Sequence, residues 1–370
     1  MLRLIILLLL IVCGWYPRAV FAGPIDYFDI TRPKFKPLPV VISMSPANHL
    51  NGLYVQSVFQ SNLEQTLFFQ IFEEKSHAEK TPNSIDFPAF RMEMQILQEK
   101  PLKFLFTLYG REQETPLASG NLSEDKKTDL RQLGLQMANT FIKNSLGFKG
   151  IAESQIAYTS QKKNGRKNIM LSSYDGTNQQ RFSYNLGSNN HASWAFDNQN
   201  LLYTTFTRSN VQIAIQPSKR LRASILSFPD GTQPQGGSWS PRGDSILITL
   251  MTKGNSDIYS YQLKNRKLER ILAWKSLETS PSWSKDASSI VFVSDSVRFQ
   301  QPQIYIHDTT KNKTRRITFR GKYNSSPRWS PDGTQILYEG KRKGYFQIFK
   351  YTLSTNRHLQ LTFGRFNSEK

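Results

Sequence analysis

The sequence predicts two domains, a small α+β domain followed by an all-β propeller, and a tryptophan repeat is the main evidence for the propeller. Four tryptophans in the second half of the chain recur at spacings of 45, 44 and 46 residues: Trp194, Trp239, Trp283 and Trp329. A β-forming run begins seven positions after each of them, at Leu201, Ile246, Ile290 and Ile336. Repeats of about 40 to 50 residues, built from short β-runs and turns, are typical of four-stranded propeller blades.

A fifth unit precedes the first tryptophan. Its β-runs include Ile156, Ile169 and Phe182, but no tryptophan strand stands before them. We therefore count five repeat units in a propeller domain of residues 148–370, and the tail (366–370) is a candidate for the missing strand. We expect the tryptophans to lie in the core between blades, because a buried indole covers about 150–250 Å².

The first 22 residues resemble an export signal. Arg3 gives a positive start, and an apolar run of nine residues follows from Leu4 to Val12. That run is too short to span a bilayer, which takes about 20 residues. A small residue, Ala22, stands at a suitable cleavage site. The sequence therefore predicts an exported chain that is cleaved after Ala22.

The only cysteine, Cys13, leaves open a second interpretation, in which it is the lipidated first residue of a lipoprotein. A lipobox has a small residue directly before the cysteine, whereas this chain has the bulky Val12. Cleavage after Ala22 would leave no cysteine in the mature chain. Disulfides and thiolate chemistry would then be excluded.

The amino-terminal domain, residues 23–147, mixes strands and helices. A proline-rich stretch leads to a short strand at 40–42, and helical spacing of apolar residues follows over 53–71. Three strands are expected at 90–97, 102–109 and 117–122. A second helix is expected from about Asp125, capped by Ser123, to Leu146, with Gly147 ending it. This irregular order indicates an α+β domain.

The two halves of the chain differ in charge. Residues 23–150 hold 14 basic and 14 acidic side chains, whereas residues 151–370 hold 32 and 14, a net charge of +18. A basic surface of this kind attracts anionic partners. Export argues against nucleic acid and leaves acidic proteins, anionic envelope glycans and lipid head groups. A general contribution to solubility is the alternative interpretation.

The sequence offers no motif for catalysis. It contains no nucleophile elbow, zinc-protease helix, P-loop or dinucleotide fingerprint, and its five histidines are scattered. Asp175, Asp308 and Asp332 recur near blade turns and are either cation ligands or, more simply, turn caps. We therefore predict a binding protein with no cofactor and no metal site.

Several segments together resemble the TolB family of the Tol-Pal envelope system. They are the Asp29–Arg32 segment (DITR) followed by prolines, the junction Leu146–Ser160 (LGFKGIAESQIAYTS), Tyr174–Asn178 (YDGTN) and Trp329–Gly333 (WSPDG). The junction is the most specific of these, because WSPDG occurs in many propellers. The resemblance covers nearly the whole chain after residue 22.

The resemblance implies a periplasmic, non-enzymatic adaptor for outer-membrane integrity and cell division. Its propeller loops would bind a Pal-like peptidoglycan-associated lipoprotein, and an amino-terminal segment would bind a TolA-like inner-membrane protein. The segment corresponds to Tyr27, Phe28, Asp29, Ile30 and Thr31. The propeller residues lie just before each tryptophan strand: Asn190, His191, Gln233, Gly236, Glu278, Thr279, Ser280, Asn324, Ser325 and Ser326.

Three points stay open at this level. The family propeller has six blades, whereas we count five units. An exported propeller that binds an anionic cell-envelope glycan is the main alternative function. Propellers of this repeat type also occur joined to serine peptidase domains, although no such domain is recognisable here.

Overall fold

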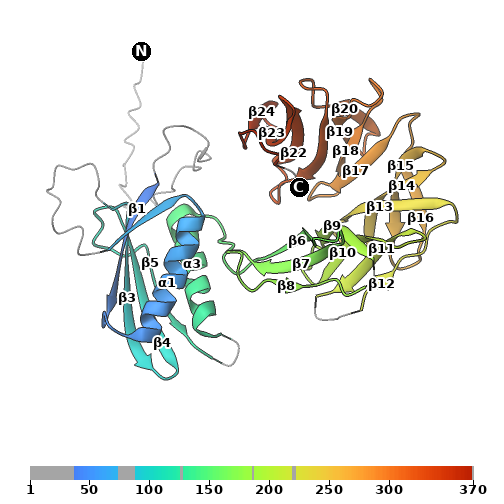
Figure 1. Ribbon diagram of the computed structural model, residues 1–370. Coiled ribbons are helices and arrows are strands. Elements are labelled where there is room, and N and C mark those ends of the chain that lie inside the picture. The colour runs from blue at the N-terminus through green and yellow to red at the C-terminus, as the bar shows by residue number, and fades with distance from the viewer. Residues whose placement is uncertain (1–36, 74–87, 126–127, 186, 219–221, 369–370) are drawn as a thin grey trace, which may run out of the picture. The chain divides into compact units, whose positions relative to one another are not determined.

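Figure 1 shows the computed structural model, which describes residues 37–73, 88–125, 128–185, 187–218 and 222–368. The expected signal peptide, Cys13 and the segment Tyr27–Thr31 lie outside the described residues. The chain divides into two compact units, Met1–Gly150 and Ile151–Lys370. This boundary falls three residues after the one that the sequence predicts.

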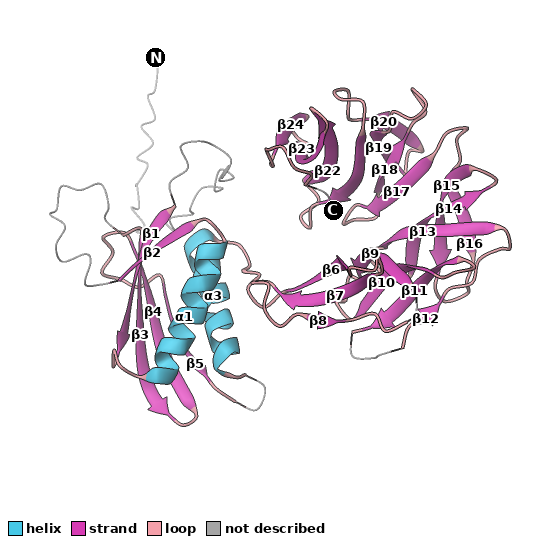
Figure 2. Ribbon diagram, viewed as in Figure 1, coloured by secondary structure: helices cyan, strands magenta, loops and turns pink. Residues whose placement is uncertain are grey.

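In its described residues, the amino-terminal unit has a five-stranded mixed sheet and two helices. Figure 2 shows these strands and helices. Its strands are β1 (Leu38–Ser45), β2 (Phe69–Glu73), β3 (Phe90–Glu99), β4 (Leu102–Gly110) and β5 (Ala118–Ser123), in the order β2-β1-β3-β4-β5. Strand β1 runs parallel to β2 and β3, and the other pairs are antiparallel. Helices α1 (Leu50–Gln65) and α3 (Leu130–Leu146) contact each other, and Phe141 joins their core to the sheet.

Two helix boundaries differ from the sequence prediction. The first helix ends at Gln65 rather than at residue 71, because Leu67 adopts a left-handed φ of 61° and Phe69 begins a strand that pairs with β1. The second begins at Leu130, because its cap is Asp129, whose carboxylate accepts the Gln132 N–H. Its predicted end is confirmed, since Gly147 is left-handed with a φ of 77°.

The second unit is a five-bladed β-propeller over the described part of residues 151–370. Blade one has three strands, β6 (Gln155–Gln161), β7 (Lys167–Ser173) and β8 (Gln180–Arg181). The other blades have four each. Blade two holds β9 (Ser188–Trp194), β10 (Asn200–Phe206), β11 (Val211–Pro217) and β12 (Ser224–Ile225), and blade three holds β13 (Thr232–Trp239), β14 (Ser245–Thr252), β15 (Asn255–Gln262) and β16 (Leu268–Leu272).

Blade four holds β17 (Glu278–Trp283), β18 (Ser289–Ser294), β19 (Gln303–Asp308) and β20 (Lys313–Arg316). Blade five holds β21 (Asn324–Trp329), β22 (Gln335–Arg342), β23 (Tyr345–Thr352) and β24 (Arg357–Gln360). Within each of these blades the strands pair antiparallel in sequence order. The first strand of each four-stranded blade, which ends in a repeat tryptophan, packs against the preceding blade.

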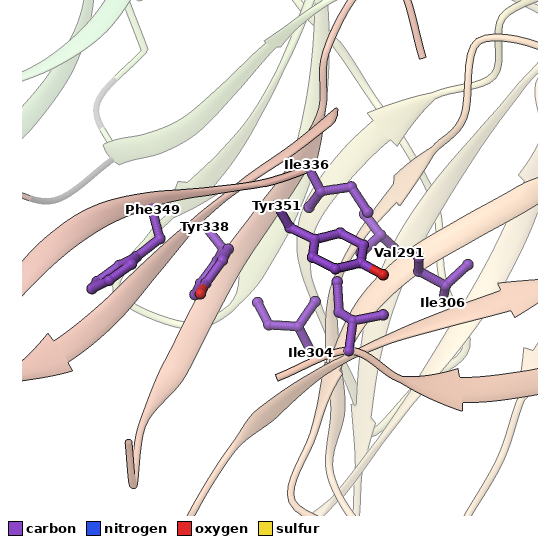
Figure 3. Packing of buried hydrophobic residues seen from close by; sticks show 8 residues of the cluster. Val291, Ile304, Ile306, Ile336, Tyr338, Phe349 and Tyr351 are labelled. Carbon is purple, nitrogen blue, oxygen red and sulfur yellow. The ribbon is translucent and has the colours of Figure 1, made fainter. Parts of the chain in front are cut away.

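The repeat tryptophans lie in the cores between blades, as predicted. Trp239 is 8% exposed and packs in the core between blades two and three, and its indole N–H donates to the Ser193 carbonyl at 3.1 Å. Trp194, Trp283 and Trp329 are partly buried against the corresponding cores. Figure 3 shows the core between blades four and five, where Tyr338 lies beside Phe349.

The described part of the tail does not complete blade one. The Ser368 N–H donates to the Phe346 carbonyl at 2.8 Å, and the Gln347 amide donates to the Phe366 carbonyl at the same distance. Both partners lie at the start of β23, so the tail stays on blade five. The expectation that it pairs with β6 is therefore wrong for the residues that the structure describes, because these local hydrogen bonds satisfy its backbone.

Candidate partner-binding face

One end of the propeller, which we name the hairpin face, collects the starts of the inner strands. The first strand of each four-stranded blade begins there, and the hairpin that joins the second and third strands turns there. Register places Phe206, the last residue of β10, opposite both Ser188 and Val211. In blade one the Lys167 N–H donates to the Ser188 hydroxyl at 3.1 Å, so its hairpin lies at this end too.

Each inner strand carries the same irregularity three residues before its tryptophan. A residue with a left-handed φ recurs at this position: His191 (55°), Gly236 (67°), Ser280 (53°) and Ser326 (51°). The register of the strand pair shifts at the same place in all four blades. These are β-bulges, which bend a strand and redirect its side chains without ending it.

The predicted partner-binding residues therefore lie within inner strands, not in loops before them, which corrects the sequence prediction. They differ in exposure. His191 and Gln233 are exposed; Asn190, Gly236, Thr279, Ser280, Ser325 and Ser326 are partly exposed; Glu278 and Asn324 are fully buried. The Ser325 and Ser326 hydroxyls donate to the Glu339 carboxylate at 3.1 and 3.0 Å.

Glu278 and Asn324 are structural, because their polar atoms are used inside the propeller. Glu278 accepts hydrogen bonds from the Trp274 N–H and from the Ser276 and Ser294 hydroxyls, and burial raises its pKa. The Asn324 amide donates to Gln303 and to the backbone of the preceding loop. Both side chains fix the connection from the previous blade, and both are fully buried.

The hairpins themselves carry a feature that our sequence reasoning missed. An exposed cation stands in the hairpin of every blade at an unvarying interval of 45 residues: Lys163, Arg208, Lys253, Arg298 and Lys343. The 45-residue period was visible in the tryptophans, and applying it to Lys and Arg would have found this set. We name these five residues the cation ring.

The opposite end of the propeller uses its aspartates differently. Asp244 and Asp286 accept hydrogen bonds from serines of their own turns, at 2.7 Å from Ser240 and 2.6 Å from Ser284. These bonds lower the pKa of both carboxyls. Three further aspartates, Asp175, Asp308 and Asp332, accept from neighbouring threonines or serines. The turn-cap interpretation of these residues is therefore confirmed.

No cluster of three or more His, Cys, Asp or Glu side chains that could hold a metal ion occurs among the described residues. In the same part of the chain, no helix is both long and apolar enough to cross a membrane.

The TolB beta propeller domain family matches residues 143–370, which is more than half of the chain. The chain belongs to the TolB β-propeller family. It is similar to the Tol-Pal system protein TolB of Desulfosudis oleivorans, with 25% identity over 279 residues, or 70% of this chain and 62% of that protein. The namesake from Ruthia magnifica is 29% identical over 147 residues, which are 38% of this chain and 34% of the relative. The matched parts thus span about one third to just over three fifths of these TolB proteins.

A solved structure of this family agrees with the fold. TolB from Acinetobacter baumannii superposes with a TM-score of 0.76 at 21% identity, covering 89% of this chain and 83% of the other. Such low identity establishes the fold and no more. The expected fold class, an α+β domain followed by a propeller, is confirmed. The five units counted in the sequence correspond to five blades in the structure, rather than to six.

Proposed function

We propose that this chain is a non-enzymatic periplasmic adaptor of a Tol-Pal-like system. Its hairpin face binds an acidic surface of a Pal-like, peptidoglycan-associated lipoprotein. The segment Tyr27–Thr31 binds a TolA-like inner-membrane protein, and the two contacts together support outer-membrane integrity and division. The chain reaches the periplasm by an export signal that is cleaved after Ala22.

The cation ring is the observation that carries this proposal. Five exposed cations at one end of a propeller with a net charge of +18 create a directed positive field. Such a field accelerates the association of an oppositely charged protein by about 10- to 1000-fold and falls steeply with salt. The partly exposed residues Thr279, Ser280 and Ser325 lie at or beside the bulges of the inner strands at the same end and add neutral hydrogen-bonding groups.

The second contact is supported by the composition of its segment. Tyr27, Phe28 and Ile30 are strand-forming side chains placed before a proline-rich stretch. A short extended segment of this kind binds by adding a strand to the edge of a partner's sheet, or it docks on its own domain. If the segment changes between these two positions when the propeller binds its partner, it signals that binding to a second protein.

Charge reversal at the two ends of the propeller tests the first contact. We would measure binding of the soluble domain of a Pal-like lipoprotein to the triple variant Arg208→Glu, Lys253→Glu and Arg298→Glu by surface plasmon resonance. The association rate should fall roughly tenfold to a hundredfold at low salt. The matched control reverses three exposed cations at the opposite end, Arg242, Lys264 and Lys285. Equal effects of the two triple variants would contradict a contact at the hairpin face.

A further inference from the structure

A cavity of about 710 Å³ lies between blades four and five, apart from the inner strands. It is lined by β20, by the connection after it, and by β22, β23 and β24. The lining includes four arginines, Arg315, Arg316, Arg320 and Arg342, and no aspartate or glutamate. Small-molecule sites commonly enclose about 300–1000 Å³, so the size fits a small ligand.

The aromatic wall of the cavity uses its polar atoms internally. The His358 Nε2 faces the Ile317 carbonyl at 3.0 Å, and a carbonyl only accepts, so this nitrogen carries the proton. The other ring nitrogen, Nδ1, then accepts a hydrogen bond from the Tyr338 hydroxyl, with 2.9 Å between the oxygen and the nitrogen. Burial lowers the pKa of His358, in keeping with the neutral ring. The polar atoms of this wall are therefore paired with one another or with the backbone. Tyr338 and Phe349 are buried with their rings stacked, as Figure 3 shows.

The arginines, in contrast, have donors to spare. Arg315 donates to the Tyr351 hydroxyl at 3.1 Å, Arg316 to the Thr318 carbonyl, and Arg342 to the Lys341 carbonyl at 2.9 Å and the Arg320 carbonyl at 3.2 Å. All of these acceptors are neutral. No ion pair joins any of the four guanidinium groups to a carboxylate within the described residues.

Two of the guanidinium groups are held in place by aromatic rings. Arg316 lies over the Phe319 ring at 5.0 Å and Arg342 over the Phe349 ring at 4.6 Å. Gly321, with a φ of 81°, leaves room for Arg342, because a Cβ there would approach its Nη1 to 2.0 Å. Stacking fixes the plane of each guanidinium, and each has more N–H donors than its neutral acceptors use. A guanidinium oriented in this way matches the paired oxygens of a carboxylate or phosphate.

We propose that this cavity binds a small ligand with two or more phosphate or carboxylate groups. Each guanidinium has five N–H donors, and neutral acceptors use only a few of them. A polyanion would supply the missing acceptors and the opposite charge at once. The site goes beyond the adaptor function, because it would take a small ligand in a cavity lined by β20, β22, β23 and β24, which is not the protein-binding surface proposed above.

Calorimetric titration of the protein with pyrophosphate, and separately with citrate, tests the proposal and distinguishes phosphate from carboxylate chemistry. The variant Arg315→Gln/Arg320→Gln removes two exposed side chains, and the control Arg242→Gln/Arg266→Gln removes the same charge from exposed positions outside both the cavity and the cation ring. We expect at least one probe to bind, with affinity about tenfold or more weaker in the cavity variant through lost charge-assisted hydrogen bonds. The control should stay within about twofold of the unaltered protein.

Two results would overturn the proposal. One is the absence of binding of both probes at millimolar concentration and low salt. The other is equal weakening in the cavity and control variants, which would mean a response to net charge alone. The variant Arg315→Lys/Arg320→Lys separates geometry from charge, because lysine keeps the charge and loses the planar fork. We expect the lysine variant to recover only part of the affinity that Arg315→Gln/Arg320→Gln loses. Recovery of the full affinity would contradict a site built on guanidinium geometry.

Discussion

Replacing Trp239 with alanine tests the assignment of the repeat tryptophans to the cores between blades. Trp239 is 8% exposed, packs against residues of blades two and three, and donates its indole N–H to the Ser193 carbonyl at 3.1 Å. Removing a buried tryptophan costs about 3–5 kcal/mol. A unit of this size loses about 2–4 °C of Tm for each kcal/mol, so Tm of the propeller should fall by roughly 6–20 °C.

Trp283→Ala provides the internal comparison. Trp283 is partly exposed, and its indole nitrogen has no hydrogen-bond partner among the described residues. The Tm decrease should therefore be smaller than for Trp239→Ala. Calorimetry or far-ultraviolet circular dichroism is the suitable assay, because the substitutions remove a fluorophore. An unchanged Tm combined with lost partner binding would refute the reasoning and place Trp239 in a binding site.

Three further predictions follow from charge, titration and the amino terminus. Raising salt should slow association of an acidic partner and leave dissociation nearly constant, because surface charges are screened beyond about 8 Å at physiological ionic strength; stopped-flow kinetics at several salt concentrations measures both rates. Burial lowers the pKa of His307 and His358 below 6.5, so the unfolded chain binds protons more readily, and Tm should decline as pH falls below 6.5. This decline should be shallower in His307→Asn/His358→Asn, and equal slopes would contradict the assignment. Deleting residues 23–31 should abolish binding of a TolA-like partner in a pull-down and preserve binding of the Pal-like lipoprotein; retention of both partners would leave the segment without a signalling role.

Periodicity made the propeller predictable, whereas single boundaries in the first unit were not. The tryptophan and the β-runs recur from blade to blade, so the propeller is still recognisable when one unit departs from the pattern. The segment at 66–71 has no such redundancy. Its apolar residues continue the helical spacing of α1, but Leu67 turns the chain and Phe69 pairs with β1. A tertiary contact thus overrode the local pattern.

The inner-strand starts were misread as loops for a related reason. Gly237, Pro281 and Pro327 stand two positions before their tryptophans, and such residues usually interrupt a strand. Here a bulge accommodates them, so the strand continues through the position. The arginine cavity could not be predicted either, because Arg315, Arg320 and Arg342 are brought together only by the packing of blade five on blade four.

The two ends of the propeller also differ in how far the fold explains their charges. The aspartates at one end cap their own turns, so local geometry accounts for them. Local turn geometry does not explain the cations of the cation ring. Lys253 and Lys343 adopt left-handed φ values of 49° and 50°, where asparagine or glycine is favoured and most other side chains are strained. Turn chemistry therefore argues against lysine at both positions, and the charge itself is the property that these residues contribute. The proposed binding of an acidic partner at the hairpin face would use that charge.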